Sequence, residues 1–207
     1  MKGTTAILAL AAFVAPAALA AQETPPTAQA AAIPAAEAAP VLDDSGVLAI
    51  FDGANRRDLE TATIAAERAR NPQVRQLAVR FANEHMALRR QGQELGRTLQ
   101  LYPQREFDAA EMQKHGQTIA WLKQVPTEQF DAAWLDHEIA FHASVLEAVQ
   151  GTLLAATTKP ELRTLIEQSV PAFEAHLAAA RDLKSALDGA AKPEVPASEP
   201  SSTNGGE

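Results

Sequence analysis

The sequence predicts an all-α protein, a bundle of four long helices with a fifth, shorter helix between its two halves. Between positions 45 and 187 the apolar residues recur with the period of a helix, and no segment alternates as a strand would. Prolines 72, 103, 126 and 160 divide this region into segments of helical length. These residues can bury a core, since a domain of about 150 residues buries roughly 68–70% of its unfolded surface.

The first two helices form a pair that meets at Asn71-Pro72. An apolar stripe from Val47 to Ala69 marks the first helix. Asn71 ends it, because a residue before proline avoids the helical region, whereas proline suits the first turn of the next helix. The second stripe runs from Val74 to Leu99, so this helix is expected to end before Pro103.

Three further helices follow. A short helix is expected over about 107–123, and residues 126–128 are expected to supply the N-cap of a helix that reaches Leu153. The last stripe extends from Leu162 to Leu187. Pro171 should bend that helix, because proline removes one interior hydrogen bond.

An internal similarity suggests how the helices are paired. The heptapeptide NPQVRQL at 71–77 resembles KPELRTL at 159–165, and each opens a helix that later carries an inward histidine. This pattern indicates two related hairpins, 46–100 and 128–187, joined by residues 101–127. A four-helix bundle with one long connection has the ferritin-like topology.

The N-terminus has the features of a secretory signal peptide. Residues 1–20 contain one basic residue, Lys2, then an apolar run over 6–14 and the small-residue pattern Ala18-Leu19-Ala20. The apolar run is shorter than the roughly 20 residues that span a bilayer, and Pro16 follows it. We therefore expect a periplasmic or secreted protein that has no membrane span after signal cleavage.

The predicted bundle, residues 45–187, lies between two segments of biased composition. Residues 21–44 are rich in alanine and proline, and residues 188–207 contain three prolines and little that is apolar. Such segments bury too little apolar surface to offset their ordering entropy. We expect a linker at 21–44 and a tail at 188–207, with Gly189 just past the last helix.

Composition excludes several classes of function. The chain of 207 residues has no cysteine, which excludes disulfide scaffolds and cysteine-ligated zinc or iron–sulfur sites. The net charge is −8 overall and −2 within 45–187, so no basic face is available for nucleic acid. No nucleophile motif or glycine-rich phosphate loop occurs, and we assign no catalytic residue.

Five ionisable residues interrupt the apolar stripes at one height in the bundle. Asp58 lies 13 residues before Asn71 and His85 lies 14 after it, so both are roughly 20 Å from that turn. The inward histidines of the second hairpin lie at similar distances from Thr158. One polar layer is therefore expected near the middle of the bundle, made of Asp58, His85, Glu138, His142 and His176.

Two hypotheses explain such a layer. Imidazoles and carboxylates that converge in a dry core are ligands of Fe, Mn, Zn or Cu. Alternatively, histidines hydrogen-bonded to carboxyl groups set the helix register without a metal, in a structural or partner-binding bundle. The spacing departs from the Glu-x-x-His motifs of di-iron bundles, so a mononuclear site fits better than a ferroxidase. We expect His137 to be solvated and His115 to lie at the rim.

Three stretches of the chain resemble a known family, the ferritin-like exported bacterial family named domain of unknown function 4142. They are AAERARNPQVRQLAVRFANEHMALRRQGQEL, FDAAWLDHEIAFHASVLEAV and KPELRTLIEQSVPAFEAHLAAARDL. The resemblance covers about residues 47–187 and implies a ferritin-like fold and export. It places the family's acidic-His pair on Glu84-His85 and its later histidines on His142 and His176. Asp58 and Phe141 stand where the family usually has acidic residues, glutamate in the first case.

Overall fold

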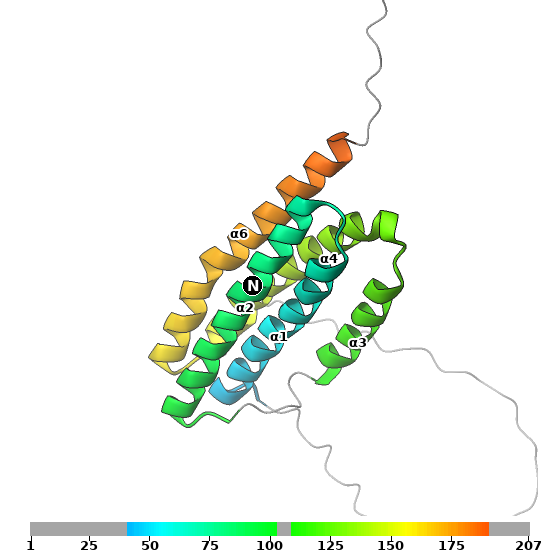
Figure 1. The fold of residues 1–207 in the computed structure, drawn as a ribbon. Helices are drawn as coiled ribbons and strands as arrows, with labels where there is room; N and C mark the ends of the chain where they lie inside the picture. Colours follow the sequence, from blue (N-terminus) through cyan, green and yellow to red (C-terminus); the bar gives the residue numbers. More distant parts are fainter. Residues whose placement is uncertain (1–40, 103–108, 191–207) are drawn as a thin grey trace, which may run out of the picture. The chain divides into compact units, whose positions relative to one another are not determined.

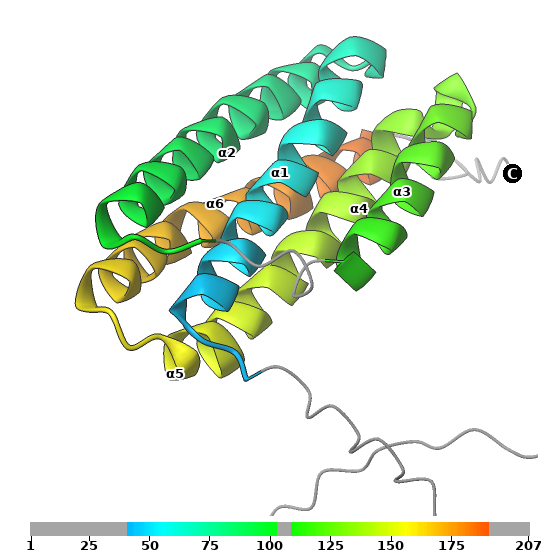
Figure 2. The ribbon, with the colours of Figure 1, turned by 90° about the horizontal axis from the view of Figure 1, so that it is seen from below.

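The computed structural model describes residues 41–102 and 109–190, and these form helices without any strand. The four long helices are α1 (Asp44–Arg68), α2 (Pro72–Leu99), α4 (Thr127–Ala148) and α6 (Pro160–Ala190). The shorter α3 (Ala109–Gln124) lies beside α1 and α4 (Figures 1 and 2). The predicted all-α bundle of two hairpins with a helix in the connection is confirmed. The predicted signal at 1–20 lies outside the described residues, as do residues 21–40 of the linker and 191–207 of the tail.

Side-chain caps explain where the first helices begin. The Asp43 carboxylate accepts a hydrogen bond from the Gly46 amide at 2.8 Å, and Asn71 caps α2 through the Gln73 amide at 2.8 Å. At its other end, α2 stops at Gln100, which adopts the left-handed conformation with φ of 57°.

Three details differ from the sequence prediction. No side chain caps α4: its N-cap residue is Pro126, and Thr127 is already helical. Helix α4 continues into a π-helical turn, η2 (Val149–Leu153), and a short α5 (Leu154–Ala156). Helix α6 extends to Ala190, so Gly189, which was expected just past its end, is still helical.

Two aspartates link the hairpins by hydrogen bonds, one at each end of the bundle. The Asp131 carboxylate of α4 accepts hydrogen bonds from the amides of Arg70 and Asn71, in the turn between α1 and α2. The Asp44 carboxylate of α1 accepts one from the Thr158 amide at 2.8 Å, just before α6. These backbone contacts fix how far one hairpin can slide along the other.

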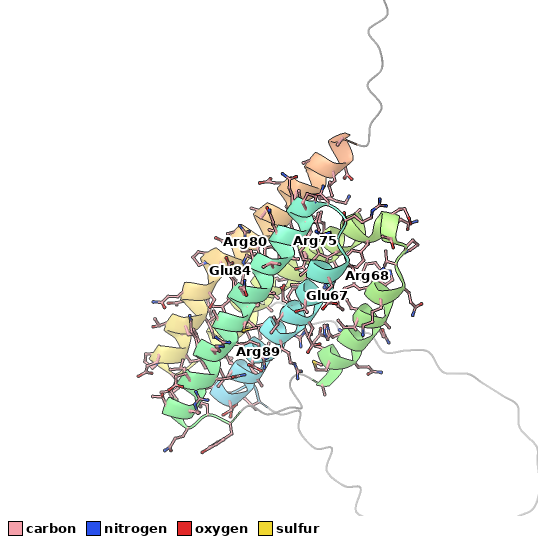
Figure 3. The ribbon with its side chains drawn as sticks, viewed as in Figure 1. Glu67, Arg68, Arg75, Arg80, Glu84 and Arg89 are labelled. Carbon is pink, nitrogen blue, oxygen red and sulfur yellow. The ribbon has the colours of Figure 1, made fainter. Side chains whose placement is uncertain are left out.

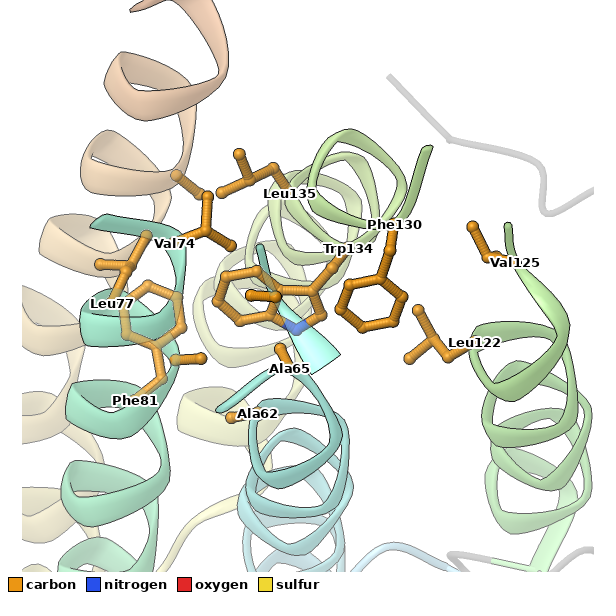
Figure 4. Packing of buried hydrophobic residues seen from close by; sticks show 13 residues of the cluster. Ala62, Ala65, Val74, Leu77, Phe81, Leu122, Val125, Phe130, Trp134 and Leu135 are labelled. Atoms are coloured by element: carbon orange, nitrogen blue, oxygen red, sulfur yellow. The ribbon is translucent and has the colours of Figure 1, made fainter. Parts of the chain in front are cut away.

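The apolar core is divided into two clusters along the bundle axis. The first surrounds Trp134, Phe81 and Phe130, and it includes Leu122 and Val125, which attach the end of α3 (Figure 4). The second contains Leu48 and Phe51 of α1 with Leu162, Ile166 and Phe173 of α6. On each long helix at least one buried polar residue lies between the two clusters.

One stretch, Thr127–Ala156, is long and apolar enough to cross a membrane by length and composition alone. In the bundle its inward side carries Trp134, Glu138 and His142, all fully buried against neighbouring helices. Only 17% of the apolar window of this stretch is buried inside the bundle.

Candidate metal centre

The polar layer between the two apolar clusters contains all five residues singled out in the sequence. Each comes from one of the four long helices, and each is at most 1% exposed. They are Asp58 of α1, His85 of α2, Glu138 and His142 of α4, and His176 of α6. The helical period therefore placed them correctly, at one height and facing inward.

Three inward nitrogens meet at the centre of this layer. His176 Nδ1 lies 3.1 Å from His85 Nε2 and 3.1 Å from His142 Nε2. Asp58 approaches the same two nitrogens from α1, with Oδ1 at 3.3 Å from His85 Nε2 and Oδ2 at 3.5 Å from His142 Nε2. Nitrogen and oxygen lone pairs thus converge on one point from all four helices.

The outward nitrogen of each imidazole donates its proton to an acceptor. His85 Nδ1–H donates to Asn55 Oδ1 at 2.8 Å, and the Asn55 amide is oriented by its own bond from Nδ2 to the Phe51 carbonyl. His142 Nδ1–H donates to the Glu138 carbonyl oxygen at 3.0 Å. His176 Nε2–H donates to a carboxylate oxygen of Glu84.

These partners define the protonation state of the three rings. A neutral imidazole carries one N–H, and in each ring that proton is on the outward nitrogen. Burial lowers the pKa of all three histidines, that of His142 to about 3, so the rings are neutral. The two 3.1 Å contacts of His176 Nδ1 therefore join lone pairs, with no hydrogen between them.

The two buried carboxyl groups have no cationic side chain to pair with. Glu138 Oε1 accepts from the Thr61 hydroxyl at 3.2 Å, and a hydrogen bond joins the Asp58 and Glu138 carboxyl groups when one of them is protonated. Burial raises the pKa of Asp58 to about 7. Burial, and then the neighbouring Asp58 charge, raise the pKa of Glu138 well above its ordinary value. The two carboxyl groups are therefore either protonated or neutralised by a bound cation.

Its dimensions fit one metal ion. The inward atoms form two sets, His85–His142–His176 and Asp58–Glu138–His142, and within each set the atoms lie within 4.8 Å of one another. Metal–nitrogen bonds of about 2.0–2.1 Å place two ligands of one ion about 3.0–3.4 Å apart, depending on the coordination angle. The separations of 3.1 and 3.3 Å lie in this range, and the 3.5 Å between His142 Nε2 and Asp58 Oδ2 lies just above it.

Aromatic rings enclose the layer. Phe81 stacks on His176 with centroids 4.1 Å apart, and Phe173 lies nearly parallel to His85 at 5.8 Å. Phe141 meets His142 edge to face at 5.7 Å. The stacked rings hold the imidazoles in place and keep water from the two ends of the layer.

The sequence analysis missed the partners of the imidazoles and misplaced two other histidines. Asn55 was visible on the α1 stripe, one turn before Asp58, but its bond to His85 depends on how the helices pack. His115, expected at the rim, is 5% exposed and bonded to Glu60 at 2.7 Å. His137, expected in solvent, is half-buried, and burial lowers its pKa to about 4.

The fold and the layer define a class, the helical bundles that carry a buried histidine–carboxylate cluster in the core. Within it, the chain belongs to the family described as "Domain of unknown function (DUF4142)", whose model matches residues 25–183. Among solved structures, the chain is similar to a DUF305 fragment from Deinococcus radiodurans, with a TM-score of 0.58 and 19% identity. That match covers 70% of this chain and 96% of the other, and it supports the fold alone. No curated protein matches the chain.

Proposed function

We propose that this bundle binds one divalent first-row transition metal ion, from among Fe, Mn, Zn and Cu. The ligands are His85 Nε2, His142 Nε2, His176 Nδ1 and Asp58, and Glu138 lies beside them. The observation that carries the proposal is the convergence of three imidazole lone pairs whose outward N–H groups all have acceptors. Metal-binding histidines are oriented in this way by their second nitrogen.

A metal-free polar layer explains the geometry less well. Protonated Asp58 can donate to one imidazole nitrogen, and protonated Glu138 to Asp58. Neither proton reaches both contacts of His176 Nδ1, which would leave lone pairs facing each other at 3.1 Å. A divalent cation attracts every inward atom and offsets two carboxylates, so the bound site is neutral.

Bound metal would join the two hairpins. Asp58 and His85 belong to the hairpin of α1 and α2, while His142 and His176 belong to that of α4 and α6. Metal coordination therefore adds to the stability of the whole bundle. We assign the protein a metal-binding role.

Elemental analysis and titration of tag-free protein test the proposal. Purified protein should contain one transition metal ion per chain, or should take up one Co²⁺ or Zn²⁺ per chain after treatment with chelator. Binding should be lost in His85→Ala and retained in His137→Ala, which removes a histidine of α4 outside the layer. A chain that binds no metal at neutral pH would establish the alternative, a structural bundle with a protonated layer.

We also propose that the chain is exported to the periplasm or beyond. The basic residue, apolar run and Ala18-Leu19-Ala20 pattern of residues 1–20 support this proposal. Mass spectrometry of protein from the periplasmic fraction should find Ala21 or Gln22 as the first residue. An exported form that retains Met1 would contradict cleavage.

A further inference from the structure

Glu84 hydrogen-bonds to the layer and also reaches the surface. The five layer residues, the acceptor Asn55 and the donor Thr61 are at most 1% exposed, whereas the Glu84 side chain is 45% exposed. Its carboxylate accepts the outward N–H of His176, and the inward nitrogen of that same ring faces the centre of the layer. Glu84 and His176 thus form a continuous polar connection between solvent and site.

We propose that Glu84 is the point through which a divalent cation enters and leaves the site, along the seam between α2 and α6. This inference rests on the proposed function. The exposed carboxylate is a capture point for a hydrated cation, and His176 is the first buried ligand behind it. Glu84 acts on the rate of metal exchange, while the ligands of the layer set the equilibrium.

The other directions are closed by apolar side chains. Phe81 and Trp134 close the layer toward one apolar cluster, and Phe173 closes it toward the other. On the opposite side a groove of about 490 Å³ approaches α4, but Phe141 stands between that groove and His142. The same groove is lined by two cationic side chains, Arg57 and Lys114, and by one carboxylate, Glu111.

A positive charge beside Glu84 should affect the rate at which a cation enters between α2 and α6. Arg80 lies one turn before Glu84 on α2, with Nε 4.0 Å from Glu84 Oε1, and it is 48% exposed. Figure 3 shows the two residues next to each other where α2 lies beside α6. Arg80 partly neutralises the carboxylate and repels an incoming cation. The two side chains therefore have opposite effects on the rate of uptake.

Stopped-flow loading of the metal-free full-length chain with Co²⁺, followed by its absorbance, tests the inference. Glu84→Gln keeps an oxygen that accepts from His176 but removes the charge. We expect loading and chelator-driven release to slow together by about tenfold, so that affinity changes far less than either rate. Arg80→Gln should accelerate both. Glu94→Gln, a matched loss of one carboxylate farther along α2, should change neither.

Each result separates this inference from the proposed function. Failure of the wild type to bind Co²⁺ at equilibrium would refute the proposed function itself. Normal equilibrium binding with unchanged rates in Glu84→Gln would refute the entry route through Glu84 and leave the proposed metal site standing. A faster rate in Phe141→Ala, with Glu84→Gln unchanged, would place the route in the groove instead. A loss of affinity in Glu84→Gln caused only by faster release would show that Glu84 acts solely by orienting His176, and would also overturn the inference.

Discussion

His142 and His176 meet edge to face in the core, with ring planes at 84° and centroids 5.1 Å apart. His142 Nε2 and His176 Nδ1 are 3.1 Å apart, and each ring has its proton on the other nitrogen. Such a contact is repulsive unless something positive lies between or beside the two nitrogens. It is the relationship on which the metal proposal depends.

Substitution of His142 should separate metal binding from folding. His142→Ala removes one ligand, so metal binding should be lost and the stabilisation by bound metal with it, about 2.7 kcal/mol at a metal concentration 100 times Kd. The melting temperature should fall more for metal-loaded than for metal-free protein. His137→Ala should keep the difference between loaded and metal-free melting temperatures. An equal fall in both forms of His142→Ala would assign His142 to packing alone.

Asp58 and His85 should be energetically coupled in metal-free protein, because Oδ1 and Nε2 are 3.3 Å apart in a fully buried layer. In a double-mutant cycle of Asp58→Ala and His85→Ala, urea unfolding should give a coupling energy of about 0.5–3 kcal/mol. As a control, Asp58→Ala and Arg163→Ala, at the start of α6, should be additive. Additivity of the first pair would contradict the shared layer.

The carboxyl groups of the layer should make metal-free protein less stable as the pH rises from about 4 through 7. Asp58, with a pKa raised to about 7, and Glu138, with a pKa raised well above its ordinary value, hold protons in the folded state that the unfolded chain releases near pH 4. The lowered pKa values of the histidines act in the opposite direction, but only below about pH 6.5, where unfolded imidazoles become charged.

Urea unfolding between pH 6.5 and 9, above the range in which the histidines contribute, measures the remaining part of this fall. Each proton still held by the folded state costs about 1.4 kcal/mol per pH unit. Glu138→Gln, which cannot ionise, should flatten the curve, and bound metal should do so as well because it keeps the carboxylates ionised. Metal uptake in weakly buffered solution should release protons. Metal-free stability that is constant over this range would show that neither Asp58 nor Glu138 holds a proton in the folded state above pH 6.5, and would contradict the prediction.

Two glycines in helices should respond oppositely to alanine. A Cβ on Gly96 would lie 2.7 Å from Leu48 Cδ2, and Leu48 is 1% exposed, so the core must shift. Gly96→Ala should lower the unfolding free energy by about 1–3 kcal/mol. Gly116 has no atom within 4 Å of the added Cβ, and Gly116→Ala should raise that energy by up to about 1 kcal/mol. Thermal unfolding of both variants checks the pair, and a stabilised Gly96→Ala would refute the close approach of α2 to α1.

Much of the bundle could be predicted because its signals are local. The Asn71-Pro72 break and the apolar period depend on neighbours within a few residues, so they specify helix limits and the inward face before any packing occurs. The rise of 1.5 Å per residue then converts positions 58, 85, 142 and 176 into one height. For these reasons the fold and the membership of the polar layer were visible in the sequence.

The chemistry of the layer was decided only when the helices packed. Whether an imidazole turns Nδ1 or Nε2 inward depends on its rotamer and on acceptors from other segments, such as Asn55 for His85 and Glu84 for His176. A helical wheel gives a direction for each side chain but neither its rotamer nor its distant partners. The burial of His115 against Glu60 likewise depends on where α3 docks. Lone pairs at 3.1 Å and an exposed carboxylate behind them are therefore properties of the tertiary structure alone.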